Sequence, residues 1–251
     1  MASNFFQCIS QCSAIAVSLL LLHLSSTGQA YAQPKKEIAA IRLNQTHYFM
    51  GTQKITIAPN AVRIDNTSQL GFTLVAKAPD WQVTLYRPDD KIFFTEPLKT
   101  FQDTGMMSEI LIGRRERFLI DRPYRQSTMM LSGFKIERIT SHWSTLKVLK
   151  LDGIAAPQVE KVLYAAYKLP THNCIPLAFT ATHQNTDFIT GMRNRGKLEF
   201  LLDTQKIEKI NVAANFFSVP ANLKRAASIR DVVSGHTNRK KSEDAEIMIE
   251  K

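Results

Sequence analysis

Apolar and polar residues alternate along several short stretches of the chain, and this period of two predicts β-strands. Val83 and Leu85, for example, fall on one side of such a stretch, and Gln82, Thr84 and Tyr86 fall on the other. The expected strands cover residues 52–58, 61–66, 71–79, 81–86, 91–97, 145–154 and 176–183, with a hairpin over 197–212 that turns at residues 203–206. Because the connections are short, neighbouring strands are expected to pair antiparallel.

Pro88, Asp89 and Asp90 interrupt the alternation between two of these strands. Proline presets φ for the second position of a turn, and aspartate is well tolerated at the next position. Adjacent carboxylates on a strand would point to opposite faces, whereas a catalytic pair has to converge across a cleft. The Asp pair therefore predicts the tip of a hairpin and no active site.

One segment, residues 156–170, changes to the spacing of a helix. Its apolar side chains recur at i, i+3, i+4, i+7 and i+8, at Val159, Val162, Leu163, Ala166 and Tyr167. Pro157 suits the first helical turn, and Pro170 ends the helix. Residues 215–233 predict a proline-containing loop and one short helix, whereas residues 33–44 read as a polar lead and 99–109 as a loop.

These elements together predict a fold class. The balance of many strands and few helices indicates an α+β, strand-rich protein. We expect a curved antiparallel sheet, an open half-barrel, with one to three helices packed on one face. Residues 110–121 and 128–141 are further candidate segments whose type the pattern leaves open.

The first 32 residues read as a signal peptide and are kept out of the fold. Residues 14–24 form an apolar run of about 11 residues, too short to span a bilayer, and Ala30-Tyr31-Ala32 offers a small-x-small cleavage site. Because no Lys or Arg precedes this run, an uncleaved N-terminal anchor is the alternative. We predict an exported protein, periplasmic or extracellular, with one domain over residues 33–233 and a flexible charged tail over 234–251.

Cysteine usage adds to this picture of the compartment. After the expected cleavage, Cys174 is the single cysteine, so no internal disulfide is expected. Small secreted eukaryotic domains usually carry several bridges, and the chain is therefore read as a bacterial envelope protein. No later segment approaches about 18 apolar residues, so no transmembrane segment is expected after cleavage.

The chain is basic, with a formal net charge of +10. Between residues 109 and 150 nine basic residues stand against four acidic ones. Five arginines are the candidates for a basic surface: Arg114, Arg115, Arg117, Arg122 and Arg125. Such a surface suits an anionic membrane. Nucleic acid is not an expected partner of an exported chain, and the alternative is a solvated basic face without a partner.

His172, Cys174 and His183 are the candidates for chemistry, because a thiol and imidazoles can bind zinc or form a Cys–His nucleophile. Their spacing matches no ligand signature, and Cys174 precedes an apolar run in which a structural thiol is expected. The motifs GxSxG, HExxH, GxGxxG and the Walker loop are absent from the chain. No catalytic residue, metal site or cofactor is therefore predicted.

Large apolar side chains are frequent on the expected strands. They either fill a core or line a groove in a sheet that does not close. The candidates for a ligand groove are Phe72, Trp81, Val83, Leu85, Ile92 and Phe94.

The order of these segments resembles a known family. The strand pair TQKITIA and AVRIDN, the hairpin QVTLYRPDDKIFFTEP and, near the end, LEFLLDTQ and FSVPANL resemble the LolA/LolB-like lipoprotein-carrier superfamily. The resemblance covers about half of the chain after residue 32, and residues 105–190 depart from it. It implies an unclosed antiparallel half-barrel with an apolar concave face, which in some members carries lipoprotein acyl chains across the periplasm.

Three functions are consistent with the sequence. The first is an exported, non-enzymatic protein that binds a lipid, a lipoprotein or another amphiphile in the groove of the sheet. The second is a structural or protein-interaction module of the cell envelope whose core is filled by its own side chains. The third is a thiol- or metal-dependent hydrolase that uses His172, Cys174 and His183.

Overall fold

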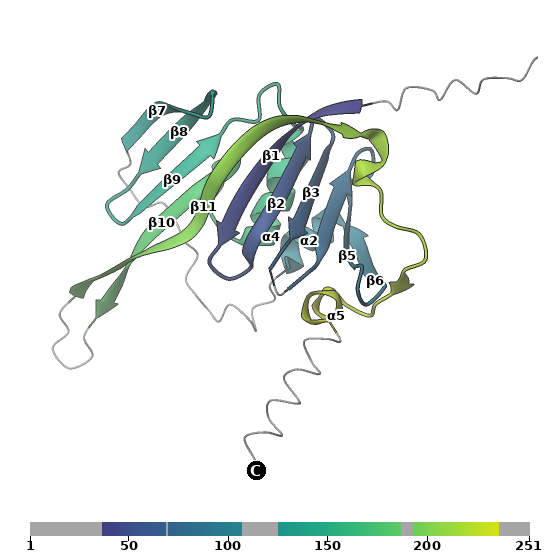
Figure 1. Ribbon diagram of the computed structural model, residues 1–251. Helices are drawn as coiled ribbons and strands as arrows, with labels where there is room; N and C mark the ends of the chain where they lie inside the picture. The colour runs from purple at the N-terminus through teal and green to yellow at the C-terminus, as the bar shows by residue number, and fades with distance from the viewer. Residues whose placement is uncertain (1–36, 69, 107–124, 187–192, 236–251) are drawn as a thin grey trace, which may run out of the picture. The chain divides into compact units, whose positions relative to one another are not determined.

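The computed structural model describes residues 37–68, 70–106, 125–186 and 193–235, and these form one sheet of twelve strands (Figure 1). The order is β12-β6-β5-β4-β3-β2-β1-β11-β10-β9-β8-β7. All neighbours pair antiparallel except the short β12, which runs parallel to β6. The edge strands β12 and β7 do not pair with each other, so the sheet is open. The predicted fold class is confirmed.

The strands are β1 (Glu37–His47), β2 (Gly51–Ala58), β3 (Ala61–Asn66), β4 (Thr73–Lys77), β5 (Gln82–Arg87), β6 (Ile92–Pro97), β7 (Arg125–Leu131), β8 (Phe134–Thr140), β9 (Ser144–Leu149), β10 (Ile175–Thr186), β11 (Arg193–Ala213) and β12 (Lys224–Arg225). The α-helices of the described residues are α2 (Leu98–Thr104), α4 (Pro157–Tyr167) and α5 (Ile229–Ser234), and η1 (Ala214–Phe217) is a 3₁₀ helix. None of these helices is both long and apolar enough to cross a membrane.

The α-helices cover one face of the sheet, which we call the helix face. Phe101 of α2, Leu163 of α4 and Val232 of α5 all belong to the core cluster that contains Leu43 and Ile55 of the sheet. In Figure 1, α2 and α4 lie behind β1, β2 and β3. The main core therefore lies between the sheet and these three helices, as the alternation of the strands requires.

A smaller cluster occupies the opposite, outer face, where η1 packs on β3 and β4. Phe217 contacts a group that includes Val75 and Tyr86. Arg63 fixes this helix: Nη1 donates to the carbonyl of Phe216 at 2.8 Å, and the guanidinium lies 4.7 Å from the centre of the Phe216 ring. Part of the outer face near β3 and β4 is thus also buried.

β11 joins the two parts of the sheet. It pairs with β10 from Arg193 to Leu202 and with β1 from Leu202 to Ala213. Past Leu202, β10 and β1 therefore diverge, and the carbonyls of Pro176 and Leu177 lose a strand neighbour. Gln45 Nε2 donates to the Pro176 carbonyl at 2.9 Å, and Thr204 Oγ1 donates to the Leu177 carbonyl. These side chains replace the ladder hydrogen bonds, because buried carbonyls need a donor.

This arrangement corrects the predicted hairpin over 197–212. Residues 203–206 do not turn, since β11 is one continuous strand of 21 residues. The pairing with β1 instead shifts register between Asn44 and Gln45, opposite this segment. Turns and β-bulges favour similar polar residues, and the sequence pattern alone did not separate them.

Two other predictions were wrong. The predicted polar lead over residues 33–44 is instead part of β1, a central strand that begins at Glu37 and buries Ala40, Ile41 and Leu43. Residues 99–109 were read as a loop, but Leu98–Thr104 form α2, which follows Pro97 and buries Phe101 alone. A seven-residue helix with one buried side chain shows no helical period.

The remaining elements follow the predictions closely. The hairpin of β5 and β6 turns at Pro88–Lys91, as the Pro-Asp-Asp step indicated. The predicted helix is α4, with Pro157 in its first turn. The signal peptide, most of the charged tail and the segment over residues 110–121 lie outside the described residues, so those predictions stay open.

Candidate functional site

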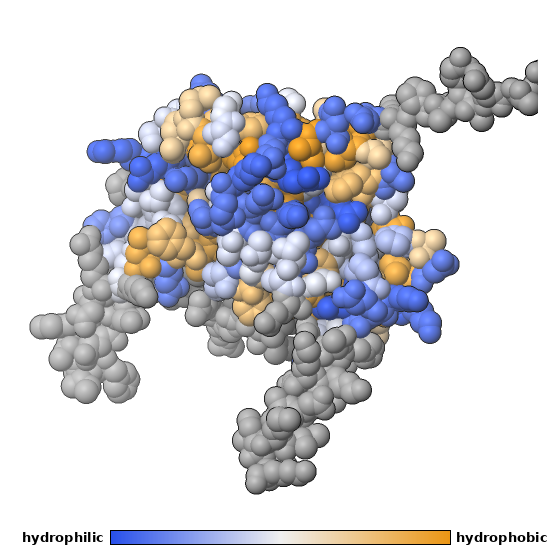
Figure 2. Space-filling view, viewed as in Figure 1, coloured by the Kyte–Doolittle hydropathy of each residue, from blue (hydrophilic) through white to orange (hydrophobic). Residues whose placement is uncertain are grey.

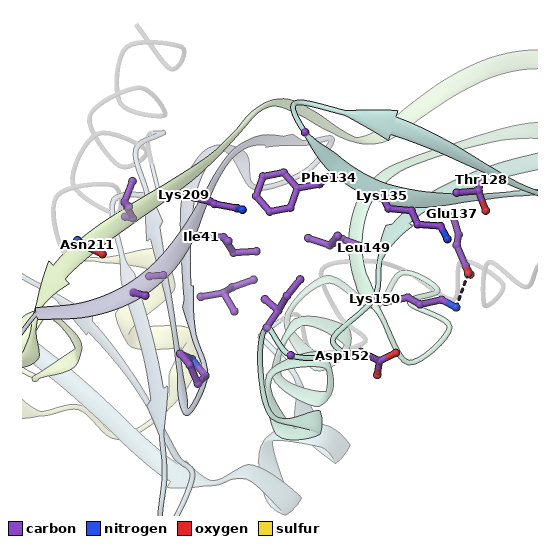
Figure 3. Close-up of a pocket in the computed structure, with 18 residues that line it drawn as sticks. Ile41, Thr128, Phe134, Lys135, Glu137, Leu149, Lys150, Asp152, Lys209 and Asn211 are labelled. Carbon is purple, nitrogen blue, oxygen red and sulfur yellow. Dashed lines mark ion pairs between the residues drawn. The ribbon is translucent and has the colours of Figure 1, made fainter.

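A large cavity opens between the two parts of the sheet, where β10 and β1 diverge. Its volume is about 1050 Å³. One wall comes from β1, β2 and the second half of β11, and the other comes from β7, β8, β9 and the turn after β9 (Figure 3). Its size lies at the upper end of the range for ligand pockets, roughly 300–1,000 Å³.

The floor of the cavity is apolar. Ile41 pairs with Ile57 across β1 and β2, and Leu149 and Phe134 face them from the other wall (Figure 3). The apolar lining residues are Ala39, Ala40, Ile41, Ile57, Pro59, Phe134, Leu149, Ile154 and Ile210. Ile41, Ile57 and Leu149 are also members of the main core, so the cavity is a direct extension of that core to the surface.

Charged side chains surround this floor. Lys135, Lys150 and Lys209 line the cavity together with Glu137 and Asp152, so the lining carries one excess positive charge. Lys209 pairs with Ile41 in the β1–β11 ladder, and its Nζ lies 5.5 Å from the centre of the Phe134 ring. A cation over an aromatic face at this distance is attracted to it, so the ammonium group is held above the floor.

Lys150 and Glu137 form an ion pair on one side of the cavity, with 2.7 Å between Nζ and Oε1 (Figure 3). The hydrogen bond from Lys150 lowers the pKa of Glu137, and the same bond raises the pKa of Lys150. Both groups are therefore charged over the physiological pH range. Because Glu137 neutralises Lys150 and also interacts with the charge of Lys135, Lys209 is the cation of this lining best placed for an anionic ligand.

The six residues predicted to line a groove lie elsewhere. Phe72, Trp81, Val83 and Leu85 are buried in the main core beneath the helices. Ile92 and Phe94 are partly buried and pack against the same core. Phe94 alone also lines a second, smaller pocket of about 260 Å³ beside α2 and α5. The large cavity contains none of the six.

The side chains predicted for thiol or metal chemistry do not form a site in the described part of the chain. His172 lies in an exposed turn with φ of 53°. Cys174 is half-buried, and burial raises the pKa of its thiol, which disfavours the reactive thiolate. His183 lies on β10, but its side chain is outside the described residues. No group of three His, Cys, Asp or Glu among the described residues could hold a metal ion.

Of the five arginines predicted to form a basic surface, only Arg125 falls in the described residues. It begins the edge strand β7 and is exposed. Arg114, Arg115, Arg117 and Arg122 lie outside them. The basic surface itself stays a prediction.

Asp90, at the predicted turn, proves to have a structural partner. Its Oδ2 lies 3.5 Å from Nε of Arg87, and both side chains are buried. Arg87 also donates to the carbonyls of Val232 at 3.0 Å and Val233 at 2.7 Å. The pair therefore holds α5 against the end of β5.

A buried polar cluster on β1 and β2 was missed from the sequence. His47 is 3% exposed, its ring stacks on Tyr167 with centroids 5.2 Å apart, and the Tyr167 hydroxyl lies 3.2 Å from Oε1 of both Gln45 and Gln53, to which it donates a shared hydrogen bond. Burial lowers the pKa of His47 from 6.5 to about 4, partly offset by the backbone carbonyl of Tyr167. The signal that could have revealed this cluster is the run of polar residues on the apolar faces of two strands.

Comparisons with known proteins add little to this picture. No known protein-family model and no curated protein sequence matches the chain. Among solved structures, an uncharacterized conserved protein from Thermus thermophilus is similar with a TM-score of 0.35 and 10% identity, over 76% of this chain and 90% of that chain. A structure of PNGF-II has a TM-score of 0.36 and 8% identity, over 79% of this chain and 33% of that chain. Neither likeness informs the function, and the LolA/LolB resemblance stays a hypothesis.

Proposed function

We propose that the chain is an exported, non-enzymatic protein that binds an anionic amphiphile in the large cavity between the two parts of the sheet. The amphiphile is a fatty acid, a lipid or the acylated end of a lipoprotein, as in LolA/LolB-like carriers. The observation that carries this proposal is the composition of the cavity, which joins an apolar floor to a rim of lysines.

The apolar floor suits an acyl chain. The partly exposed Phe134, Ile154 and Ile210 provide apolar surface beside the core residues of the lining. Each methylene of a bound chain that leaves water there contributes about 0.8 kcal/mol. Open apolar surface of this kind favours occupation, because filling it removes both the ligand and the lining from water.

The lysines suit the head group. Lys209 is exposed, and its ammonium group lies above the Phe134 ring at the edge of the floor. A carboxylate or phosphate placed there would meet Lys209, with its acyl chain directed toward Leu149 (Figure 3). The cavity therefore offers a charged contact to one end of the ligand and an apolar contact to the other end.

Binding of a fluorescent fatty-acid analogue, kept below its micelle concentration, tests the proposal. We expect saturable binding, and Lys209→Glu should weaken it about five- to tenfold, because an exposed ion pair contributes up to about 1 kcal/mol and reversal adds repulsion. Lys54→Glu is the matched control, because Lys54 is an exposed lysine of β2 outside the cavity lining. No saturable binding, or equal losses in both variants, would exclude this site.

One observation favours the alternative of a structural or interaction module. Val83 and Leu85, predicted to face a groove, are fully buried under the helices, so that part of the sheet is filled by the protein's own side chains. Native mass spectrometry of the protein from its own cell envelope separates the two functions. A mass without ligand, together with no binding of the probe, would support the alternative.

A further inference from the structure

Four large apolar side chains are exposed close together at the junction of β1, β2 and β11, and we call them the apolar patch. Phe200 is 67% exposed, Leu198 49%, Phe49 40% and Tyr48 37%. The backbone N–H of Tyr48 donates to the carbonyl of Leu201 at 3.0 Å, which brings the β1–β2 turn beside this part of β11. Single exposed apolar residues are ordinary, but a contiguous group indicates a contact surface.

Leu198 and Phe200 of the patch lie on the outer face of the sheet, away from the helices. Phe179 of β10 is buried in the main core, so its neighbour Thr180 points to the opposite face. Phe200 pairs with Thr180, and Leu198 pairs with Thr182. Figure 2 shows this face, with apolar surface over the first half of β11 next to a broad hydrophilic band over the middle of the sheet.

Cations accompany the patch on this face. Thr180 pairs with Thr145, so Lys147, two residues further along β9, shares the face with Phe200. Arg138 pairs with Lys147, and Arg125 pairs with Thr140, which places both arginines on the same face.

Few carboxylates offset these cations. Glu137 alternates with Arg138 and turns to the helix face, where it pairs with Lys150. Among the described residues of β7 to β10, no Asp or Glu shares the outer face with the three cations. Of the acidic residues of β11, Glu199 pairs with the core residue Ala181 and so turns to the helix face, whereas Asp203 and Glu208 follow the patch. The face therefore combines exposed aromatic side chains with a local excess of positive charge.

We propose that this outer face of β7 to β11 docks on an anionic lipid bilayer, with Leu198 and Phe200 inserted at the interface. Arg125, Arg138 and Lys147 contact the head groups. Aromatic and aliphatic side chains enter the interfacial layer, and each nearby basic residue adds about 1 kcal/mol on an anionic leaflet. A second copy of the chain fits less well, because two faces of the same positive charge repel each other.

The proposal does not depend on the cavity, because neither the patch nor the three cations line it, and a local reporter tests the proposal in the full chain. Phe200→Trp places a fluorophore in the patch, and Tyr164→Trp is the matched control, because Tyr164 is 43% exposed on α4. With phosphatidylcholine vesicles containing about one quarter phosphatidylglycerol, we expect the Phe200→Trp emission to shift to shorter wavelength and the control emission to stay unchanged. High salt, about 0.5 M, should reduce the shift through screening.

A second measurement uses sedimentation with the same vesicles. Replacing Leu198 and Phe200 by Ser together should lower the partition coefficient about tenfold, whereas Tyr164→Ser should leave it unchanged. Absence of an emission shift for Phe200→Trp on vesicles that do bind the protein would overturn the proposal. A shift that depends on protein concentration without vesicles would also overturn it and would identify self-association instead. Binding of the fluorescent fatty-acid analogue in the cavity is measured separately from binding to vesicles. Failure of the bilayer proposal therefore does not imply failure of the proposed ligand site, and the reverse also holds.

Discussion

Acid should destabilise this protein through His47, and replacing that residue should remove most of the effect. The ring is 3% exposed and its Nδ1 accepts hydrogen bonds from the backbone N–H groups of Phe49 at 3.3 Å and Met50 at 3.2 Å. A proton on Nδ1 would replace this acceptor by a donor that faces two other donors. Burial of the ring also disfavours its charged form, and it lowers the pKa of His47 from 6.5 to about 4 in the folded protein.

The sign and size of the effect follow from these two values. Because the unfolded chain takes up the proton more readily, stability is fully present above pH 6.5 and is lost as the pH falls through about 4. The difference between these two pKa values corresponds to a total of about 3 kcal/mol of stability. Between about pH 7.5 and pH 5, roughly 2 kcal/mol of this should already be lost, since the unfolded His47 is then protonated and the folded one is not.

Urea denaturation at these two pH values measures the loss. We expect His47→Gln to be less stable than the wild type at pH 7.5 but to lose about 2 kcal/mol less on going to pH 5. The matched control is His172→Gln in the exposed turn, which should keep the wild-type pH dependence. If His47→Gln and the wild type lose equal stability over this interval, the buried, neutral state of His47 is refuted.

Three further changes test the packing. Arg87→Met should cost about 3–5 kcal/mol in thermal denaturation, because it removes the guanidinium that pairs with the buried Asp90 and donates to the carbonyls of Val232 and Val233; a loss below about 1 kcal/mol would contradict the buried pair. Phe179→Ala should lower the free energy of unfolding by about 3–5 kcal/mol in urea denaturation, because the side chain is fully buried. A loss as small as that of an exposed substitution, below about 0.5 kcal/mol, would show that this core is loosely packed. Gly105→Ala should destabilise more than Gly133→Ala in the same assay, because a Cβ at Gly105 would lie 2.8 Å from a backbone carbonyl oxygen and one at Gly133 meets nothing within 4 Å; equal effects would contradict this local geometry.

The strands that the sequence predicted well are those with one buried and one exposed face. In β5, Val83 and Leu85 are buried and alternate with Gln82 and Thr84, which are more exposed, and the local pattern was sufficient to find the strand. β1 was missed because it is central in the sheet and carries polar side chains on both faces: Gln45 and His47 are buried on the helix face with Leu43. Buried polar residues remove the hydrophobic signal on which the prediction rests.

The cavity could not be predicted from local patterns. Its two walls come from residues 39–59 and 209–211 on one side and from residues 128–154 on the other, and only the topology of the sheet brings them together. The error at residues 203–206 made this harder, because a hairpin there would have ended β11 before Lys209. The candidate groove was placed on β5 and β6 because their alternation was clear, but alternation shows a buried face and does not show what covers it.

The junction at Leu202 explains why the buried polar cluster and the two proposed contact surfaces occur together. β11 has 21 residues and changes its pairing partner from β10 to β1 along its length. Some carbonyls of β10 therefore have no backbone donor from β11, and the side chains of Gln45 and Thr204 donate to them instead. The same divergence opens the cavity on one side of the junction and leaves Phe200 exposed on the other. His47 pairs with Leu202 at this point. Loss of the neutral imidazole in acid should therefore loosen the junction first, ahead of the strands that pair along their whole length.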